Sequence, residues 1–295
     1  MVSVIIPFHD GLDDLRKCLR ALGEQTYPAD KVEIIAVDNG SAEDTGPVRA
    51  SHPGVRWLTE PRAGSYVARN AGLLQARGEI VAFTDADCAP SPDWLREAVA
   101  ALEGAPATIV GGRIDYLNPP DRGLNVFELF EEEFFLLARQ KELIERFGVA
   151  ATANLVAYRA VFDRVGLFDP ELKSLGDGEW VKRATGLGEV LRYADAAVVR
   201  HPRRDTFRAV FRKMRRIAGG RALLLRKDGE SPRRLAADIY RYSVLNPRIQ
   251  RYALRFPGIR GAGPRFRMFF LIEFLSLANS FEKIRVLLGA PSYRG

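Results

Sequence analysis

The sequence predicts an α/β fold in which a mostly parallel central sheet is flanked by helices and followed by a helical C-terminal extension. Two observations predict this fold class. Apolar, β-branched runs alternate with segments of roughly 10 to 15 residues that carry apolar residues at helical spacing, which is typical of parallel βαβ units. From about residue 203 the composition changes to arginine-rich helical segments broken by glycine and proline. We therefore expect two parts, residues 1–202 and residues 203–295.

The individual elements follow from local patterns. Strands are expected at residues 2–7, 32–37, 54–58, 79–84 and 108–116, and helices at residues 12–24, 65–75 and 92–102. Leu15, Leu19 and Leu22 give the first helix an apolar stripe at helical spacing. A long, aromatic and acidic helix is expected over residues 125–146, and a further strand and helix within residues 154–165.

Composition places the chain among globular proteins. Hydrophobic residues make up 47% and charged residues 27% of the 295 residues, which is ordinary for an enzyme. The two cysteines, Cys18 and Cys88, argue against a disulfide framework and fit a reducing, cytoplasmic compartment. The chain opens with a predicted strand rather than a signal peptide, and no apolar run is long enough to predict a membrane-spanning helix.

The net charge of +7 is unevenly distributed along the chain. Residues 203–267 contain 19 Lys and Arg against four acidic residues, a net +15, so the remainder sums to −8. Such an extension indicates an anionic partner: a membrane surface, a nucleic acid or an acidic glycan. Apolar residues alternate with arginines at helical spacing in residues 207–226, which suits a helix lying on the inner face of the plasma membrane. The alternative is that these apolar faces pack on the N-terminal part or on a second subunit of a homodimer.

Two acidic residues at the end of a predicted strand give the clearest indication of chemistry. Asp85 and Asp87 directly follow the apolar run 78–83. Carboxylates this close repel each other and raise each other's pKa, and a bound divalent cation removes that penalty. Mg²⁺ or Mn²⁺ suits such hard oxygen ligands and would in turn hold a diphosphate. Ligands of parallel sheets bind outside the carboxyl ends of the strands, so Pro7 and Asp38 are expected in the same crevice.

Five short segments within residues 2–202 resemble a known family in their order as well as in their residues. They are Val2–Pro7, Gln25–Pro28, Val37–Ser41, Gly64–Gly72 and Phe83–Asp87. They resemble the opening strand, the helix exit, the V-D-[ND]-x-S turn, the G-x-x-x-A-R-N-x-G segment and the D-x-D motif of the inverting glycosyltransferases of family 2. The resemblance implies a Rossmann-like GT-A fold. It also implies metal-dependent transfer of a sugar from a nucleotide-sugar donor, expected to be a UDP-sugar, with Mn²⁺ or Mg²⁺ as cofactor.

The resemblance also implies which residues bind the nucleotide. The main chain near Pro7 lies at a free strand end and can hydrogen-bond a base edge, and Asp38 would accept an N–H of uracil. The alternative for Asp38 is a turn-forming role, since Asp-Asn-Gly is a turn signal. Arg69 would pair with phosphate charge or pack at the start of its helix. Asp85 would lie near the ribose or the water shell of the metal.

The cation itself would be held by Asp87, with Asp85 beside it. His201 ends a predicted strand, and the resemblance makes it a candidate third metal ligand, as in some relatives. The alternative is that His201 is a structural histidine, which is common for a single histidine in a protein interior.

The catalytic base is expected at Asp177. An acceptor hydroxyl must lose its proton as it attacks the anomeric carbon. The segment Gly176–Arg183 resembles the family motif E-D-x-E-L-x-x-R, with Gly176 standing in place of the first Glu. Asp177 also suits a helix cap, and the cap and base roles are compatible.

Three further residues are expected on the acceptor side, where a glycan or lipid-linked acceptor would bind. They are Asn154, Glu179 and Trp180. Trp180 has two interpretations, stacking on a sugar face or packing in the interior.

Two alternatives from other functional classes stay open. Because Gly176 replaces the expected Glu, one is a catalytically impaired protein that only binds nucleotide. The other is a nucleic-acid-binding protein that uses the arginine-rich extension, although no recognisable reading motif supports it, so no nucleic acid is expected as a partner. His9 and Asp10 stand where relatives carry an aromatic residue followed by Asn, which leaves UDP, GDP and dTDP open as the nucleotide.

Overall fold

The computed structural model describes residues 1–104, 108–119, 121–256, 259 and 261–293, which fall into two compact units. The first unit comprises Met1–Leu117, Leu136–Glu171 and Gly176–Pro202, and the second comprises Asn118–Phe135, Leu172–Leu175 and the chain from Arg203 onward. The second unit thus includes two segments that precede residue 203. The division into domains 1–202 and 203–295 stays a prediction.

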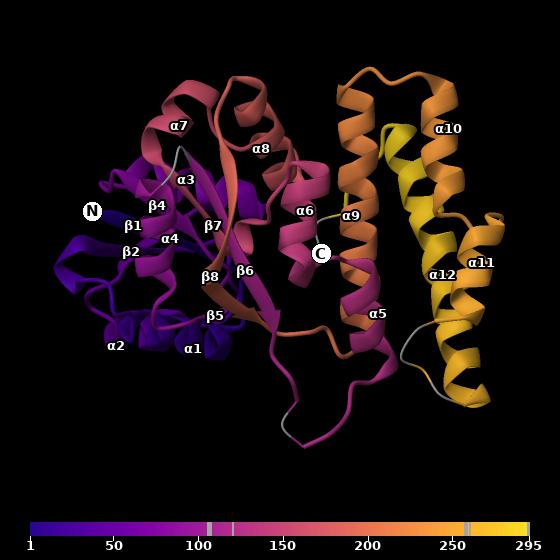
Figure 1. Cartoon of the computed structure of the whole chain (residues 1–295), viewed down its shortest axis with the longest axis horizontal. Helices are drawn as coiled ribbons and strands as arrows, with labels where there is room; N and C mark the ends of the chain where they lie inside the picture. Colours follow the sequence, from indigo (N-terminus) through magenta and orange to yellow (C-terminus); the bar gives the residue numbers. More distant parts are fainter. Residues whose placement is uncertain (105–107, 120, 257–258, 260, 294–295) are drawn as a thin grey trace. The chain divides into compact units, whose positions relative to one another are not determined.

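The first unit is built on a mostly parallel sheet, as the sequence predicts. Its strand order over the described residues is β3-β2-β1-β4-β7-β6-β8-β5 (Figure 1). The strands are β1 (Val2–Phe8), β2 (Val32–Asp38), β3 (Arg56–Thr59), β4 (Ile80–Phe83), β5 (Ala89–Pro90), β6 (Ile109–Tyr116), β7 (Leu155–Tyr158) and β8 (Leu191–His201). Strand β1 pairs in parallel with β2 and β4, and β6 pairs in parallel with β8. Strand β7 runs antiparallel to both β4 and β6, and β5 runs antiparallel to β8.

Helices flank this sheet. They are α1 (Leu12–Gly23), α2 (Gly46–Ser51), α3 (Ser65–Gln75), α4 (Trp94–Glu103), α6 (Gln140–Phe147), α7 (Arg159–Val165) and α8 (Gly176–Gly186), with short 3₁₀ turns at Ala29–Lys31, Leu137–Arg139 and Thr152–Asn154. All seven residues of β1 are buried, as expected for a parallel strand covered on both faces. The predicted stripe Leu15, Leu19 and Leu22 is buried in the same core.

The expectation of one helix over residues 125–146 is wrong. Helix α5 (Val126–Phe134) ends where Leu136 adopts a left-handed backbone conformation with φ +55°, and α6 starts afresh at Gln140. The buried Gln140 side chain donates from Nε2 to the carbonyl oxygens of Gly112 and Asn154, each at 2.9 Å. The two short helices belong to different units.

The second unit is helical. Its helices are α5, α9 (Phe207–Lys227), α10 (Pro232–Arg241), α11 (Pro247–Leu254) and α12 (Ala262–Leu287). Apolar side chains of α5, α9, α11 and α12 form its core, among them Phe130, Val210 and Leu275. Ser231 and Asn246 cap α10 and α11, each followed by a proline at the first helical position. Among the helices that the structure describes, none is long and apolar enough to span a membrane.

The strand directions define a single functional edge of the sheet. Because β7 is antiparallel to both of its neighbours, β6 and β8 run in the same direction as β1, β2 and β4. The carboxyl ends of these five strands therefore lie at one edge. Ligands of such sheets bind at this edge.

Candidate active site

The carboxyl edge of the sheet carries most of the residues that the sequence singles out. Pro7 lies near the end of β1 and is paired with Val37 of β2, and Asp38 is the last residue of β2. Asp85 follows β4 after one intervening residue, and His201 is the last residue of β8. Residues far apart in the sequence are thus brought to one edge by the parallel strand directions.

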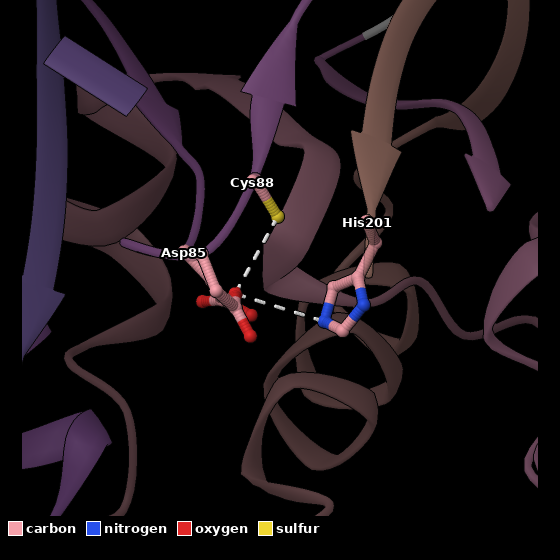
Figure 2. A group of neighbouring side chains, drawn as sticks. Asp85, Cys88 and His201 are labelled. Atoms are coloured by element: carbon pink, nitrogen blue, oxygen red, sulfur yellow. Dashed lines mark hydrogen bonds and ion pairs between the residues drawn. The ribbon is translucent and has the colours of Figure 1, made fainter. Parts of the chain in front are cut away.

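Four side chains at this edge form a cluster of metal-ligand type. One ligand atom from each of Asp85, Asp87, Cys88 and His201 lies within 4.8 Å of the others. Asp87 Oδ1 is 3.8 Å from His201 Nε2 and 3.9 Å from Cys88 Sγ. Figure 2 shows Asp85, Cys88 and His201 converging from the loop after β4 and from the end of β8.

The backbone carbonyl of the following residue, Pro202, orients the His201 ring. Its Nδ1 atom lies 2.6 Å from the carbonyl oxygen of Pro202, a contact that requires a proton on Nδ1. The other ring nitrogen, Nε2, faces Asp87 Oδ1. Metal-binding histidines are commonly fixed in this way by a hydrogen bond from the other ring nitrogen. The imidazole is only 3% exposed, so its rotation is restricted.

The donor set fits a hard divalent cation. Burial raises the pKa of the Cys88 thiol well above its ordinary value, and the carboxylates of Asp87 and Asp85 raise it further. Cys88 is therefore a neutral thiol, a weak ligand beside two carboxylates and an imidazole. Carboxylate oxygen and imidazole nitrogen suit Mn²⁺ or Mg²⁺, whereas thiolates favour softer metals. Asp85, Asp87 and His201 are therefore the three residues of this cluster that suit Mn²⁺ or Mg²⁺.

Arg69 lies directly against this cluster. Its guanidinium is buried, and Nη2 forms an ion pair with Asp85 Oδ1. The Nε atom of Arg69 is buried without a hydrogen-bond partner in the described part of the chain. Arg69 therefore fixes one oxygen of Asp85 and adds positive charge at the place where the sequence predicts a phosphate.

Asp38 has the turn-forming role that the sequence left as an alternative. Its Oδ1 accepts the backbone N–H of Ser41 at 2.9 Å, and Oδ2 lies 3.5 Å from Arg49 Nη2. The neighbouring Asn39 joins this turn to the start of α3, because its side chain donates to Glu60 O and accepts from Gly64 N, both at 2.8 Å. The turn is thus held in place whether or not Asp38 also contacts a base.

Asp177 is held by donors from three elements. Its Oδ1 accepts from the Tyr66 hydroxyl at 3.1 Å and from Gly178 N at 2.9 Å, and Oδ2 accepts from Thr152 N at 3.2 Å. It lies in the first turn of α8, where the helix dipole favours a negative charge. The carboxylate is half-buried, so it is fixed but still reachable.

Gly176 departs from the family motif for a steric reason. A Cβ atom at this position would lie 2.7 Å from Cε2 of Tyr66, closer than packed atoms come. Tyr66 is buried and also packs on Phe168. The glycine makes room for the ring whose hydroxyl binds Asp177, so the replacement of Glu is tied to Tyr66.

The acceptor-side role expected of Asn154 and Trp180 stays a prediction that their burial does not favour. Both are fully buried. Asn154 donates to the carbonyl oxygens of Arg113 and Ala197 and accepts from the Trp94 indole, so its amide links the sheet to α4.

Trp180 packs in the interior, the second of its two interpretations. Its ring stacks on Phe162 with 4.1 Å between the ring centroids, and its indole N–H donates to Gly166 O. Glu179 stays half-buried and forms an ion pair with Arg183 at 2.8 Å. Of the three residues expected on the acceptor side, Glu179 alone retains solvent access.

Sequence reasoning missed Cys88 and Tyr66. Cys88 is adjacent to Asp87, and its position just after the D-x-D motif was an available signal. Tyr66 lies three residues before Arg69, a spacing that places both side chains on one face of α3. Its contact with Asp177, 111 residues later in the chain, is visible only in the folded structure.

A GT-A-like sheet with a carboxylate and imidazole cluster at its carboxyl edge is the architecture of a nucleotide-sugar glycosyltransferase. Residues 3–166 match the family described as glycosyl transferase family 2. The chain is 36% identical over 241 residues to glycosyltransferase AglE of Haloferax volcanii, which covers 80% of this chain and 78% of that protein. The chain belongs to glycosyl transferase family 2.

Two solved structures share the fold. One is the mannosyltransferase PcManGT of Pyrobaculum calidifontis in complex with GDP-Man and Mn²⁺, with a TM-score of 0.56 at 20% identity, covering 98% of this chain and 75% of that chain. The other is S. aureus TarS 1–349 in complex with UDP-GlcNAc, with a TM-score of 0.55 at 22% identity, covering 74% of this chain and 65% of that chain.

Proposed function

We propose that this protein is a metal-dependent, inverting glycosyltransferase that moves a sugar from a UDP-sugar donor to a hydroxyl group of a glycan or lipid-linked acceptor. One observation carries the proposal. Asp85, Asp87 and His201 converge at the carboxyl edge of the sheet, at the same edge as the Asp38 turn. A single crevice would then hold the nucleobase and the diphosphate of one donor, together with the cation.

Asp85, Asp87 and His201 would hold Mn²⁺ or Mg²⁺. When bound, the cation neutralises the diphosphate and stabilises the nucleoside diphosphate as it leaves. Arg69 orients Asp85 through their ion pair, and its buried Nε has no hydrogen-bond partner among the residues that the structure describes. PcManGT has the same fold and was solved in complex with Mn²⁺, which supports the proposal of a divalent cation here.

Asp177 would act as the general base. Its carboxylate takes the proton of the acceptor hydroxyl while that oxygen forms a bond to the anomeric carbon. The bond from that carbon to the diphosphate breaks on the opposite face, and its electron pair leaves with the nucleoside diphosphate. The donors from Tyr66 and Thr152 hold the carboxylate in one orientation, which keeps a proton acceptor aimed at a fixed point.

Pro7 and Asp38 would contact the nucleobase. The main chain near Pro7 would hydrogen-bond a base edge, and Asp38 would accept the N–H of uracil. The structural relatives leave both pyrimidine and purine donors as candidates, since one carries UDP-GlcNAc and the other GDP-Man.

The two alternative classes receive less support. The impaired-enzyme alternative rests on Gly176, and the steric need for glycine beside Tyr66 accounts for that residue without loss of the base. The nucleic-acid alternative gives no role to the cluster around Asp87.

Calorimetric titration with UDP, GDP and dTDP, each with and without Mn²⁺, tests the donor site. We expect tight binding of UDP that is lost without metal. Tighter binding of GDP would change the donor class, and binding that ignores metal would remove the cation from the proposal.

Turnover of the Asp177→Asn variant tests the base. We expect a loss of about 10² to 10⁴-fold in transfer, with metal-dependent nucleotide binding intact. Asp163→Asn, an exposed carboxylate on α7, is the matched control and should retain full transfer. Normal transfer by Asp177→Asn would exclude Asp177 as the base.

A further inference from the structure

Helix α12 exposes apolar residues along most of its length, while its buried side combines apolar and polar residues. From Met268 to Leu288, all of the exposed side chains are apolar: Phe270, Phe274, Leu277, Phe281, Ile284 and Leu288. The buried side chains of the same stretch include Ser276, Asn279, Glu282 and Lys283. A surface helix in water normally turns its polar residues outward. We call the six exposed residues the apolar stripe.

The polar residues of α12 are satisfied inside the second unit. Glu282 pairs with Arg215 of α9 and with Arg285, and Lys283 pairs with Asp238 of α10 at 2.6 Å. In Figure 1, α12 is the long yellow helix, and it packs against α9, α10 and α11. The stripe is therefore fixed outward by a network of ion pairs on the opposite side of the helix.

Exposed arginines border the stripe. Phe207 of α9 is exposed and contacts Phe274, with 5.5 Å between the ring centroids, which extends the apolar surface onto α9. Arg208 and Arg212, one turn apart on α9, are exposed beside it, and Arg265 and Arg267 are exposed on the first turns of α12. Apolar side chains bordered by arginines are the pattern of a helix that lies in a membrane interface.

We propose that the apolar stripe docks on an anionic lipid bilayer, with the bordering arginines contacting the headgroups. Charge favours this occupant over a second copy of the chain. Residues 203–267 carry a net +15, so a dimer through this face would bring two strongly basic units together. An anionic surface instead attracts each arginine close to it. This docking would anchor the protein without a spanning helix.

Vesicle sedimentation of the full chain tests the docking. The probe is phosphatidylcholine vesicles with about 30 mol% phosphatidylglycerol, compared with phosphatidylcholine alone. We expect partitioning onto the anionic vesicles, and at least about a tenfold loss of it for Phe270→Ser/Phe281→Ser. The control is the double variant Leu74→Ser/Leu187→Ser, which changes two similarly exposed apolar residues of the first unit. It should bind the anionic vesicles as the wild type does.

Further measurements separate the lipid from other occupants. Arg208→Gln/Arg212→Gln should weaken binding to anionic vesicles, as should about 0.5 M salt. Metal-dependent nucleotide binding should be unchanged in every variant, which shows that the first unit is folded. Unchanged partitioning of the phenylalanine variant would overturn the proposal. So would a wild-type dimer, seen by analytical ultracentrifugation, that Phe281→Ser dissociates.

A separate observation concerns Tyr66 and rests on the proposed function. Tyr66 and Arg69 lie on one face of α3, with the Arg69 guanidinium 5.5 Å from the centre of the Tyr66 ring. Arg69 binds Asp85, and Tyr66 binds Asp177. One turn of helix thus links the proposed metal site to the proposed base. Burial raises the pKa of the Tyr66 hydroxyl, so it stays protonated and donates to the carboxylate.

We infer that Tyr66 is a positioning residue that orients Asp177. Tyr66→Phe keeps the ring and its packing and removes only the donor. We expect kcat to fall about tenfold, the effect of one lost hydrogen bond to a charged group, with KM for the donor and nucleotide binding unchanged. Tyr193→Phe removes a comparable bond from tyrosine to Asp195 elsewhere in the first unit, and should leave kcat unchanged.

Failure of the positioning role of Tyr66 can be distinguished from failure of the proposed base, Asp177. If Asp177→Asn is inactive and Tyr66→Phe has normal kcat, the positioning role is wrong and the proposed function stands. If Asp177→Asn is fully active, the proposed base itself is wrong.

Discussion

The first unit and the second unit place their clustered charged residues in different settings. In the first unit, Asp85, Asp87 and His201 gather at a sheet edge with their ligand atoms within 4.8 Å of one another, beside the guanidinium of Arg69. In the second unit, the buried carboxylates of Glu131, Asp238 and Glu282 are each bound by two cations. Glu131 contacts Lys213 and Arg204, at 2.9 and 2.7 Å.

The difference indicates which charged clusters suit a ligand and which stabilise the fold. Asp85 and Asp87 lie close together, with the guanidinium of Arg69 paired to Asp85, and a bound cation would relieve their repulsion. Carboxylates enclosed by two Arg or Lys side chains are already neutralised. The same contrast extends to the apolar residues. In the first unit, apolar strands such as β1 and β4 are buried. In the second unit, ion pairs on one side of α12 keep the apolar stripe exposed on the other.

Asp87→Ala should give the largest effect and tests the first half of the comparison. Its loss removes a metal ligand, so we expect transfer to fall by about 10³-fold or more and metal-dependent nucleotide binding to disappear. Calorimetry and a transfer assay measure both, with Asp163→Ala as the exposed control. Retained metal-dependent binding would move the cation site elsewhere.

Asp238→Ala tests the second half. It leaves Lys283, which is 2% exposed, without its carboxylate partner inside the second unit. Breaking a buried pair in this way should lower the free energy of unfolding by about 3 kcal/mol. Urea denaturation followed by circular dichroism measures the loss, and nucleotide binding should survive it. A change below about 0.5 kcal/mol would show that this pair does not support the fold.

Gly176→Ala should have an intermediate effect on the first unit. The added methyl group meets the Tyr66 ring, so we expect a loss of about 2 kcal/mol in thermal or urea unfolding. Gly186→Ala at the other end of α8 is the matched control, because its Cβ meets nothing within 4 Å. Equal stability of the two variants would contradict the steric explanation for the missing Glu.

Acid should weaken the second unit through Glu282. Burial raises the pKa of this carboxyl, but hydrogen bonds from Arg285 and Arg215 outweigh burial and leave the pKa below its usual 4.5. A lowered folded pKa gives stability that is present above pH 4.5 and is lost as the pH falls below it. Urea unfolding as a function of pH should show this loss, and Glu282→Gln should flatten it. An unaltered slope would remove Glu282 from the effect.

Phe281→Ser should have the smallest effect on folding. Its side chain is 65% exposed, so the free energy of unfolding should change by less than about 0.5 kcal/mol. Leu275→Ala, from the buried face of the same helix, should cost about 2 to 5 kcal/mol. A large loss in Phe281→Ser would mean that the stripe packs within the protein and is not a docking surface.

Local patterns were sufficient for much of the first unit. The apolar run of β1, the stripe of α1 and the glycine turn before β4 each predict their element, because burial on a strand or a helix imposes a fixed period. The edge that collects Pro7, Asp38 and Asp85 also follows from sequence, since parallel strands joined by helices end on the same side. The family and its D-x-D motif can also be recognised from the sequence of this unit.

Contacts between distant segments were decided only by the tertiary structure. Asn154 and Trp180 are motif neighbours of the site, yet their side chains turn into the core, which no local pattern reports. The break at Leu136 separates helices α5 and α6, which have apolar residues at the same helical spacing but belong to different units.

The sequence by itself determined the fold class, the family and the carboxylates at the strand ends, because these depend on period and order along the chain. The tertiary structure decided that Tyr66 holds Asp177 and that Gly176 must stay small beside it. It also decided that α12 faces its phenylalanines outward, because the ion pairs of Glu282 and Lys283 with other helices fix its rotation. Such choices depend on which side chains meet in space, and the chain order does not encode them locally.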